Sequence, residues 1–188
     1  MKPRARLKAL LVERSVRLGE FTLASGARSS YYVDARRTTM SAEGQALTGK
    51  VCWDALRASG LDFTHVGGLT MGADPVAYAI ARESFDTGEP RDAFSVRKQP
   101  KGHGTGQQVE GGLPSGARCL VVEDSMTSGG SALKAVEVLR EHGCTVVGVL
   151  TLVDREEGGR ERLDAAGLPL VAVYTGAELL DAARAATA

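Results

Sequence analysis

Short runs rich in β-branched residues alternate with longer amphipathic segments along most of this chain. The candidate strands are Thr64–Val66, Ala93–Val96, Ala117–Val122, Thr145–Leu152 and Leu170–Tyr174. The segments between and after them have the apolar spacing of helices, at about residues 41–59, 75–85, 130–142 and 176–186. Because parallel strands need a long crossover, usually a helix, this alternation predicts an α/β fold. We expect a central, mostly parallel five-stranded sheet flanked by helices.

The first forty residues have a different pattern. A helix is predicted at about residues 4–15, and two apolar runs, Phe21-Thr22-Leu23 and Tyr31-Tyr32-Val33, flank the glycine-containing segment Ser25–Arg28. Two such runs around a short turn are typical of a hairpin. We therefore expect residues 1–40 to form a small N-terminal hood. Since the chain has no internal repeat and its length suits one core, residues 1–188 are expected to form a single domain.

The charges of the chain balance, with 23 Lys and Arg residues against 23 Asp and Glu residues. This argues against nucleic-acid binding through bulk electrostatics, so an anionic ligand needs a local cluster of cations. No apolar run is long enough to cross a bilayer, and none follows the basic N-terminus as a secretory signal requires. Cys52, Cys119 and Cys144 lack metal or redox spacing, which favours reduced core thiols and a cytoplasmic location.

The most informative segment lies between the apolar run Cys119–Val122 and the helix expected after it. It begins with two adjacent carboxylates, Glu123 and Asp124. Directly after them comes a segment that we call the phosphate turn, consisting of Ser125, Met126, Thr127, Ser128, Gly129, Gly130 and Ser131. Glycines let the backbone approach a ligand closely, and unpaired amides at a helix N-terminus favour an anion. Ribose hydroxyls are suitable donors to the two carboxylates, and Mg²⁺ would reduce their repulsion of a phosphate.

The segment therefore predicts a site for a ribose 5-phosphate, with an ordinary capped helix as the alternative. Other phosphate and catalytic motifs fail. Gly67–Gly72 has the glycine spacing of a P-loop, but Ala73-Asp74 follows where a P-loop has lysine and serine or threonine. The absence of HExxH, G-x-S-x-G and paired CxxC motifs argues against zinc and hydrolase chemistry.

The acidic pair and the phosphate turn resemble the phosphoribosyl-pyrophosphate-binding motif of type I phosphoribosyltransferases. Within that family, Arg97-Lys98-Gln99-Pro100-Lys101-Gly102-His103 is similar to the catalytic loop of orotate phosphoribosyltransferases at every cation and at the histidine. Gly19–Leu23 with Ser25-Gly26, and Val153-Asp154-Arg155, resemble further blocks of the same family. The blocks extend from about residue 19 to 160, so the resemblance covers most of the chain. It implies the type I phosphoribosyltransferase fold.

The resemblance implies that residues 98–113 contain a flexible catalytic loop. It assigns catalytic roles to Lys101 and His103 in this loop and to Asp124. Displacement of pyrophosphate from C1 of the ribose develops charge that preplaced cations stabilise. His103 is a candidate proton donor because its charge changes near neutral pH. A solvated surface loop is the alternative interpretation.

The resemblance of this loop also implies contacts with substrate and with a second subunit. Arg97 and Lys98 at its start are expected to contact substrate. In this family the loop reaches the neighbouring subunit's site, so the resemblance implies a homodimer that shares residues 97–106 across its interface.

The turn Thr70, Met71 and Gly72 is expected to bind pyrophosphate through its backbone amides. Asp74 is expected to approach Mg²⁺ through water. An ordinary strand-to-helix turn is the alternative. Many relatives carry a Tyr-Lys pair in this turn, which is absent here, so the resemblance gives no lysine contact from it.

For the base, Tyr32 is expected to stack on orotate, and Arg155 resembles an arginine that pairs with the carboxylate or a carbonyl of the ring. Strand packing is the alternative for Tyr31-Tyr32. Ala24 stands where many relatives have a lysine that reaches the reacting centre.

These expectations combine into one activity. The chain is expected to transfer the 5-phosphoribosyl group from phosphoribosyl pyrophosphate to orotate with Mg²⁺, giving orotidine 5′-monophosphate and pyrophosphate in de novo pyrimidine synthesis. Its expected partners are these substrates, and neither nucleic acid nor membrane. A phosphoribosyl-pyrophosphate-sensing regulator is one alternative, disfavoured by the lack of a helix-turn-helix signature. A purine-base phosphoribosyltransferase is another, and it gives no reason for the spacing from Arg97 to His103.

Overall fold

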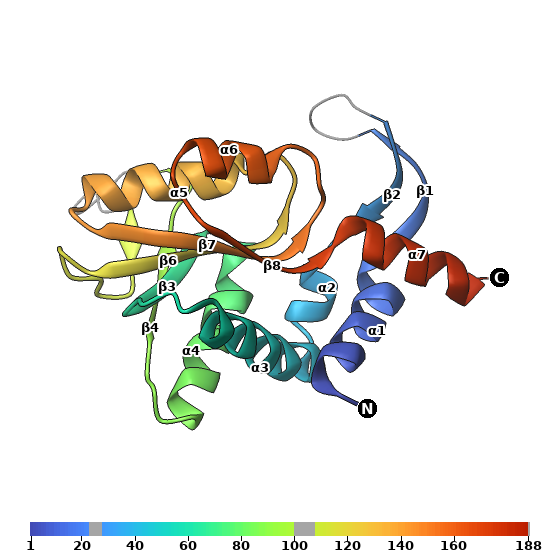
Figure 1. The fold of residues 1–188 in the computed structure, drawn as a ribbon, viewed down its shortest axis with the longest axis horizontal. Coiled ribbons are helices and arrows are strands. Elements are labelled where there is room, and N and C mark those ends of the chain that lie inside the picture. The colour runs from blue at the N-terminus through green and yellow to red at the C-terminus, as the bar shows by residue number, and fades with distance from the viewer. Residues whose placement is uncertain (23–27, 100–107, 188) are drawn as a thin grey trace.

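A computed structural model of the chain describes residues 1–22, 28–99 and 108–187. Its main sheet has the strand order β5-β4-β3-β6-β7-β8 (Figure 1). The strands are β3 (His65–Leu69), β4 (Asp92–Val96), β5 (Val109–Glu110), β6 (Arg118–Met126), β7 (Thr145–Asp154) and β8 (Leu170–Thr175). All are parallel except β5, which pairs antiparallel with the neighbouring strand β4. The five predicted strands are confirmed, but the described sheet has six, because a two-residue strand has no periodicity to detect.

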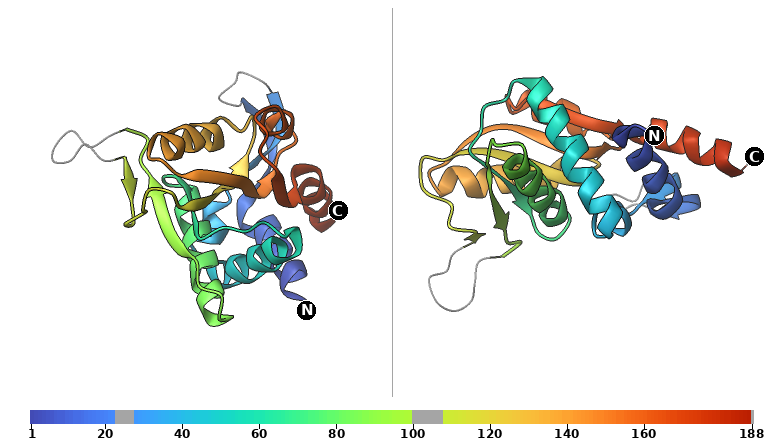
Figure 2. Two further views of the ribbon diagram at one scale, coloured as in Figure 1. Left: turned by 60° about the vertical axis from the view of Figure 1, so that its left-hand side comes forward. Right: turned by 90° about the horizontal axis from the view of Figure 1, so that it is seen from below.

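Helices cover both faces of this sheet (Figures 1 and 2). On one face lie α3 (Ala42–Ser59) and α4 (Ala73–Asp86), and on the other α5 (Gly130–Glu141) and α6 (Gly159–Ala165). At the end of the sheet, α7 (Gly176–Thr187) packs against α1 (Pro3–Ser15). The long helices agree with the predicted ranges within about two residues. The short helices α2 (Arg36–Thr39) and α6 were not predicted, since one or two turns leave little apolar periodicity.

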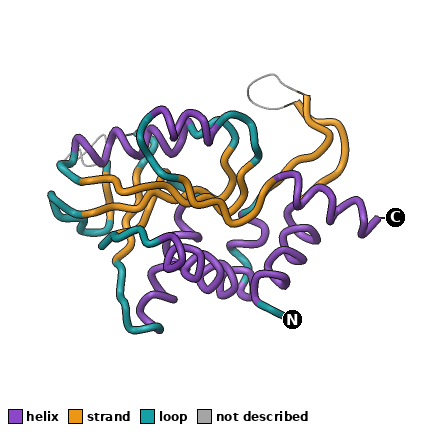
Figure 3. Tube along the Cα trace, in the orientation of Figure 1, coloured by secondary structure: helices purple, strands orange, loops and turns teal. Residues whose placement is uncertain are grey.

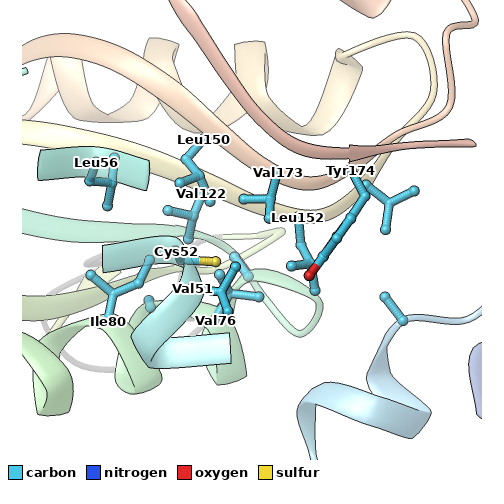
Figure 4. Packing of buried hydrophobic residues seen from close by; sticks show 14 of the residues in the cluster. Val51, Cys52, Leu56, Val76, Ile80, Val122, Leu150, Leu152, Val173 and Tyr174 are labelled. Carbon is cyan, nitrogen blue, oxygen red and sulfur yellow. The ribbon is translucent and has the colours of Figure 1, made fainter. Parts of the chain in front are cut away.

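The hydrophobic core has two parts, one on each side of the sheet. Figure 4 shows the larger part, in which side chains of α3 and α4 pack against β6, β7 and β8. Its labelled members are Val51, Cys52, Leu56, Val76, Ile80, Val122, Leu150, Leu152, Val173 and Tyr174. All three cysteines are buried and free, as predicted. The core thus fixes the sheet from both faces and leaves its carboxyl edge open to a ligand.

The predicted N-terminal hairpin is present. Strands β1 (Val16–Thr22) and β2 (Arg28–Val33) pair antiparallel and project from the body of the molecule (Figure 3). Strand β2 lies near the segment that follows β7, since the side chain of Arg155 contacts Ser29 and Tyr31. The hairpin therefore forms one wall above the carboxyl edge of the sheet.

The connections place a crevice between β3 and β6. The chain leaves β3 into α4 on one face of the sheet and leaves β6 into α5 on the opposite face. Ligands of open α/β folds bind where the direction of the connections reverses in this way. In the part of the chain that the structure describes, no helix is both long and apolar enough to span a membrane.

Candidate active site

A cleft of about 1070 Å³ opens at this crevice. Its walls come from the hood strand β2 with the residues after it, the turn after β3, the residue Lys98 after β4, the acidic pair, the phosphate turn, and residues 155–157. The lining residues are Arg28, Ser29, Tyr32, Val33, Asp34, Arg36, Leu69, Thr70, Met71, Gly72, Ala73, Lys98, Glu123, Asp124, Ser125, Thr127, Ser128, Ser131, Arg155 and Glu157. Most of the predicted substrate-binding residues thus lie together in one cleft.

The predicted strand, turn and helix are present, but the strand is longer than expected: β6 continues through Ser125 and Met126, and only residues 127–129 of the phosphate turn join it to α5. Gly129 has a φ of 70°, the left-handed region that favours glycine, and α5 begins at the next residue. A second cavity of about 370 Å³ adjoins the cleft here and is lined by Gly129, Gly130, Ser131 and Lys134 among others. The first amides of α5 have no partner within the helix, so they are available to an anion.

Helix α6 holds the phosphate turn from outside. A Cβ at Gly159 would lie 2.6 Å from the carbonyl oxygen of Thr127, so the two backbones are in close contact. The Arg162 guanidinium donates a hydrogen bond from Nη1 to the carbonyl oxygen of Ser128, at 2.9 Å. The conformation of the turn therefore depends on a helix that the sequence did not reveal.

Met126 was predicted to contact substrate, but its side chain does not line the cleft. It is fully buried in the core between the sheet and α5. Its carbonyl oxygen accepts a hydrogen bond from the backbone amide of Arg155, at 2.8 Å. Met126 thus ties the phosphate turn to the segment that follows β7.

The acidic pair lies at the end of β6. Glu123 is 8% exposed, and among the described residues its Oε1 has no hydrogen-bond partner. Burial and then the neighbouring Asp124 charge raise the pKa of Glu123 to about 7. Burial also raises the pKa of Asp124, while a hydrogen bond from the backbone amide of Ser125 and then the Arg36 charge oppose this effect. A buried carboxyl with a free oxygen fits a ligand that brings hydroxyl donors or a cation.

The turn after β3 meets the acidic pair directly. A Cβ at Gly72 would lie 2.4 Å from Oδ1 of Asp124, so glycine allows this contact. Thr70 and Met71, joined by a cis peptide bond, line the same cleft. Asp74 does not line it: its Oδ1 accepts a hydrogen bond from the Ser95 hydroxyl at 2.7 Å. Its approach to Mg²⁺ stays a prediction.

Two groups mark the opposite end of the cleft. Tyr32 is 39% exposed, and its ring lies 5.7 Å from that of Phe21, centroid to centroid. The side chain of Arg155 is only 2% exposed and forms an ion pair with Glu157, at 3.0 Å. An aromatic face next to an oriented guanidinium can bind a flat, acidic ring.

Of the two predicted loop cations that the structure describes, one lies at the cleft and the other does not. Lys98 lines the cleft, and its carbonyl oxygen accepts a hydrogen bond from Nζ of Lys134 at 2.9 Å. Arg97 lies outside, paired through Nε with Glu110 at 2.7 Å. Lys101 and His103 fall outside the described residues, as do Ala24 and residues 100–107, which make up most of the range 97–106 and half of the range 98–113.

Sequence reasoning missed the lining residues Arg28, Arg36 and Glu157. Arg36 donates a hydrogen bond from Nε to Oδ1 of Asp34 at 2.9 Å. The basic pair Arg36-Arg37, shortly after the tyrosines, was a usable signal of a cationic wall. For Glu157, the only signal in the sequence was its position two residues after Arg155.

The comparisons with known proteins agree with this geometry. Residues 48–166 match the model of the phosphoribosyl transferase domain family. The orotate phosphoribosyltransferase of Aquifex aeolicus is 46% identical over 183 residues, covering 96% of this chain and 99% of that protein. That of Bradyrhizobium sp. (strain BTAi1 / ATCC BAA-1182) is 48% identical over 181 residues, 94% of this chain and 97% of its own length.

The solved structures agree as well. Orotate phosphoribosyltransferase of Mycobacterium tuberculosis H37Rv, in complex with 5-phospho-alpha-D-ribosyl 1-diphosphate, has a TM-score of 0.78 and 42% identity, covering 95% of this chain and 99% of that one. An adenine phosphoribosyltransferase of Leishmania tarentolae, 16% identical with a TM-score of 0.62, shares the fold alone. Near-complete coverage at this identity, together with the acidic pair and its phosphate turn, shows that the chain belongs to the orotate phosphoribosyltransferase family.

Proposed function

We propose that this chain transfers the 5-phosphoribosyl group from phosphoribosyl pyrophosphate to orotate, in pyrimidine biosynthesis. One observation carries the proposal: a single cleft has an anion-binding helix terminus at one end and a buried, oriented arginine at the other. Between them lie the buried carboxyl of Glu123 and the half-buried carboxyl of Asp124, both suited to ribose hydroxyls. A purine lacks an acidic group to pair with Arg155, so the cleft favours orotate.

The reaction forms a bond between N1 of orotate and C1 of the ribose, and breaks the bond from C1 to the pyrophosphate oxygen. Amides of residues 127–131 would hold the 5-phosphate, and Glu123 with Asp124 the ribose hydroxyls. The turn of Thr70, Met71 and Gly72 would receive the leaving pyrophosphate. Lys101 and His103 are proposed to stabilise and protonate it, because cations aimed at developing charge lower the barrier.

We further propose Mg²⁺ as the cofactor. The described residues contain no cluster of three metal-ligating side chains. This fits Mg²⁺, which is commonly held by one or two carboxylates together with substrate oxygens and water. The unpaired Oε1 of Glu123 and the carboxylate of Asp124 are the available oxygens at the cleft. When bound with the substrate, the ion would offset the negative charge of the pyrophosphate group.

The homodimer is also a proposal, with residues 97–106 shared across its interface. It predicts complementation between two inactive variants, Lys101→Ala and Asp124→Asn. If Lys101 acts on the partner's site, random mixing restores about a quarter of wild-type activity through sites that are intact in both respects. No recovery after subunit exchange would contradict the shared loop. The buried free cysteines support the further proposal of a reducing, cytoplasmic location for a single-domain enzyme.

The activity is tested by mixing the protein with phosphoribosyl pyrophosphate, Mg²⁺ and either orotate or hypoxanthine, and following the absorbance of the base. We expect consumption of orotate only. Asp124→Asn should lower turnover about 100-fold while the protein stays folded, because it removes a charge from the centre of the cleft. Consumption of hypoxanthine would favour the purine enzyme, and binding of phosphoribosyl pyrophosphate without turnover would favour the regulator.

A further inference from the structure

The guanidinium of Arg155 is held by groups from the hood strand β2. Its Nε donates a hydrogen bond to the hydroxyl of Tyr31 at 3.2 Å, and its Nη2 donates to Oγ of Ser29 at 3.3 Å. The guanidinium carbon also lies over the Tyr31 ring, 4.3 Å from the centroid. Two edges and one face of this planar group are therefore occupied by residues more than 120 positions away in the sequence.

The contacts leave one edge of the guanidinium for a ligand. Arg155 has five N–H donors. The single donor of Nε is directed at Tyr31, and Nη2 serves Ser29 and Glu157. Among the described residues, Nη1 has no partner. Since Arg155 lines the cleft, this edge is the one that can bind an oxygen of the base.

We propose that Tyr31, supported by the cleft-lining residue Ser29, is a positioning residue for orotate binding. Both residues act through Arg155, because they fix the rotation of its guanidinium so that the Nη1 edge is directed at the base. This inference rests on the proposed function. Tyr31 itself does not line the cleft, so its effect on a substrate has to pass through Arg155.

Two features of the packing indicate that Ser29 and Tyr31 orient the Arg155 guanidinium and do not merely touch it. The Ser29 hydroxyl donates to the carbonyl oxygen of Tyr31 at 2.7 Å, so toward Arg155 the Ser29 oxygen acts as an acceptor. A Cβ at Gly176, the first residue of α7, would lie only 2.2 Å from the Tyr31 hydroxyl and 3.3 Å from Cα of Arg155. The hydroxyl is thus enclosed between α7 and the guanidinium, and a methyl group at position 176 would displace it.

The first test is Tyr31→Phe, which keeps the ring under the guanidinium and removes only the acceptor. We expect the KM for orotate to rise about fivefold, less than for a direct hydrogen bond to a charged group, because the lost bond acts on orotate only through Arg155. The KM for phosphoribosyl pyrophosphate should stay within about twofold of the wild-type value. Ser29→Ala should have a similar but smaller effect, since Nη2 keeps its partner Glu157.

Gly176→Ala tests the same contact between Tyr31 and Arg155, because the added methyl group would displace the Tyr31 hydroxyl. It should raise the KM for orotate as Tyr31→Phe does, although neither the glycine nor the new methyl group reaches the cleft. In the double variant Tyr31→Phe with Gly176→Ala, the clash with the hydroxyl is gone. The double variant should therefore have the same KM for orotate as Tyr31→Phe alone, within a factor of about two.

Tyr174→Phe is the matched control. It also deletes one tyrosine hydroxyl, which donates to the carbonyl oxygen of Arg4 in the core, away from the cleft. It should leave both KM values unchanged. The inference is overturned if Tyr31→Phe and Gly176→Ala leave the KM for orotate unchanged, or raise both KM values equally. A wild-type protein that does not consume orotate would instead refute the proposed function.

Discussion

The two ends of the cleft are built in opposite ways. The proposed phosphate end consists of the consecutive residues 123–131, and the groups proposed to bind there are chiefly backbone amides at the start of α5. The base end combines side chains of β2 with Arg155 and Glu157, which lie far apart in the sequence. A contiguous site needs mainly the right local backbone, whereas an assembled site needs the whole fold to bring its side chains together. Each end should therefore respond to its own class of substitution.

The largest expected effect concerns stability and the phosphate end. Burial raises the pKa of Glu123 to about 7 in the folded protein, above its unfolded value. The stability that this group contributes is present at low pH and is lost as pH rises through 7. Between pH 4.5 and 8, Glu123→Gln should gain on the order of 3 kcal/mol in free energy of unfolding relative to wild type.

Urea denaturation without ligands at several pH values measures this difference. A constant difference between the two proteins across this range would show that Glu123 titrates normally. It would also remove the contrast between a phosphate end that contains a buried, incompletely paired carboxyl and a base end whose buried arginine is held by several partners.

Arg155→Lys tests the base end next. Lysine keeps the charge but lacks the planar fork that contacts Tyr31, Ser29 and Glu157 at once. The KM for orotate should rise about 30-fold, as for a lost charge-assisted pair, while that for phosphoribosyl pyrophosphate changes little. Initial-rate kinetics with each substrate varied in turn separates the two values. An equal rise in both would mean that the two ends are not independent.

Gly159→Ala tests the phosphate end through α6. The added methyl group would lie 2.6 Å from the carbonyl oxygen of Thr127 and should shift the turn. We expect the KM for phosphoribosyl pyrophosphate to rise about tenfold, with the KM for orotate unchanged. Gly60→Ala is the control, because its φ of 71° penalises alanine at an open position at the end of α3. It should lower stability and change neither KM; a similar KM change in both variants would point to general destabilisation.

Arg162→Gln should have the smallest effect. The exposed side chain of Arg162 donates one hydrogen bond to Ser128 from outside the turn. Its loss should raise the KM for phosphoribosyl pyrophosphate about threefold, because an exposed hydrogen bond contributes less than about 1 kcal/mol. Initial-rate kinetics with each substrate varied in turn measures this change. A rise in the KM for orotate, with the KM for phosphoribosyl pyrophosphate unchanged, would contradict the assignment of Arg162 to the phosphate end.

This contrast also explains what the sequence could predict. The alternation of strands and helices, and the strand-turn-helix around residues 119–142, have local patterns, and the structure confirms them. At the base end, Tyr32 and Arg155 came from the family resemblance. Tyr31 and Glu157 had no pattern of their own, since their roles arise only when β2 folds against the segment after β7. Helix α6 and strand β5 were too short to produce a periodic signal.

The central claim is that one ligand spans both ends, with its phosphate at the turn and its base at Arg155. A crystal structure with bound orotidine 5′-monophosphate tests it most directly. We expect the 5-phosphate on the amides of residues 127–131, ribose hydroxyls on Glu123 and Asp124, and the ring beside Nη1 of Arg155. A nucleotide bound in the reverse direction, or with its ring remote from Arg155, would contradict the account.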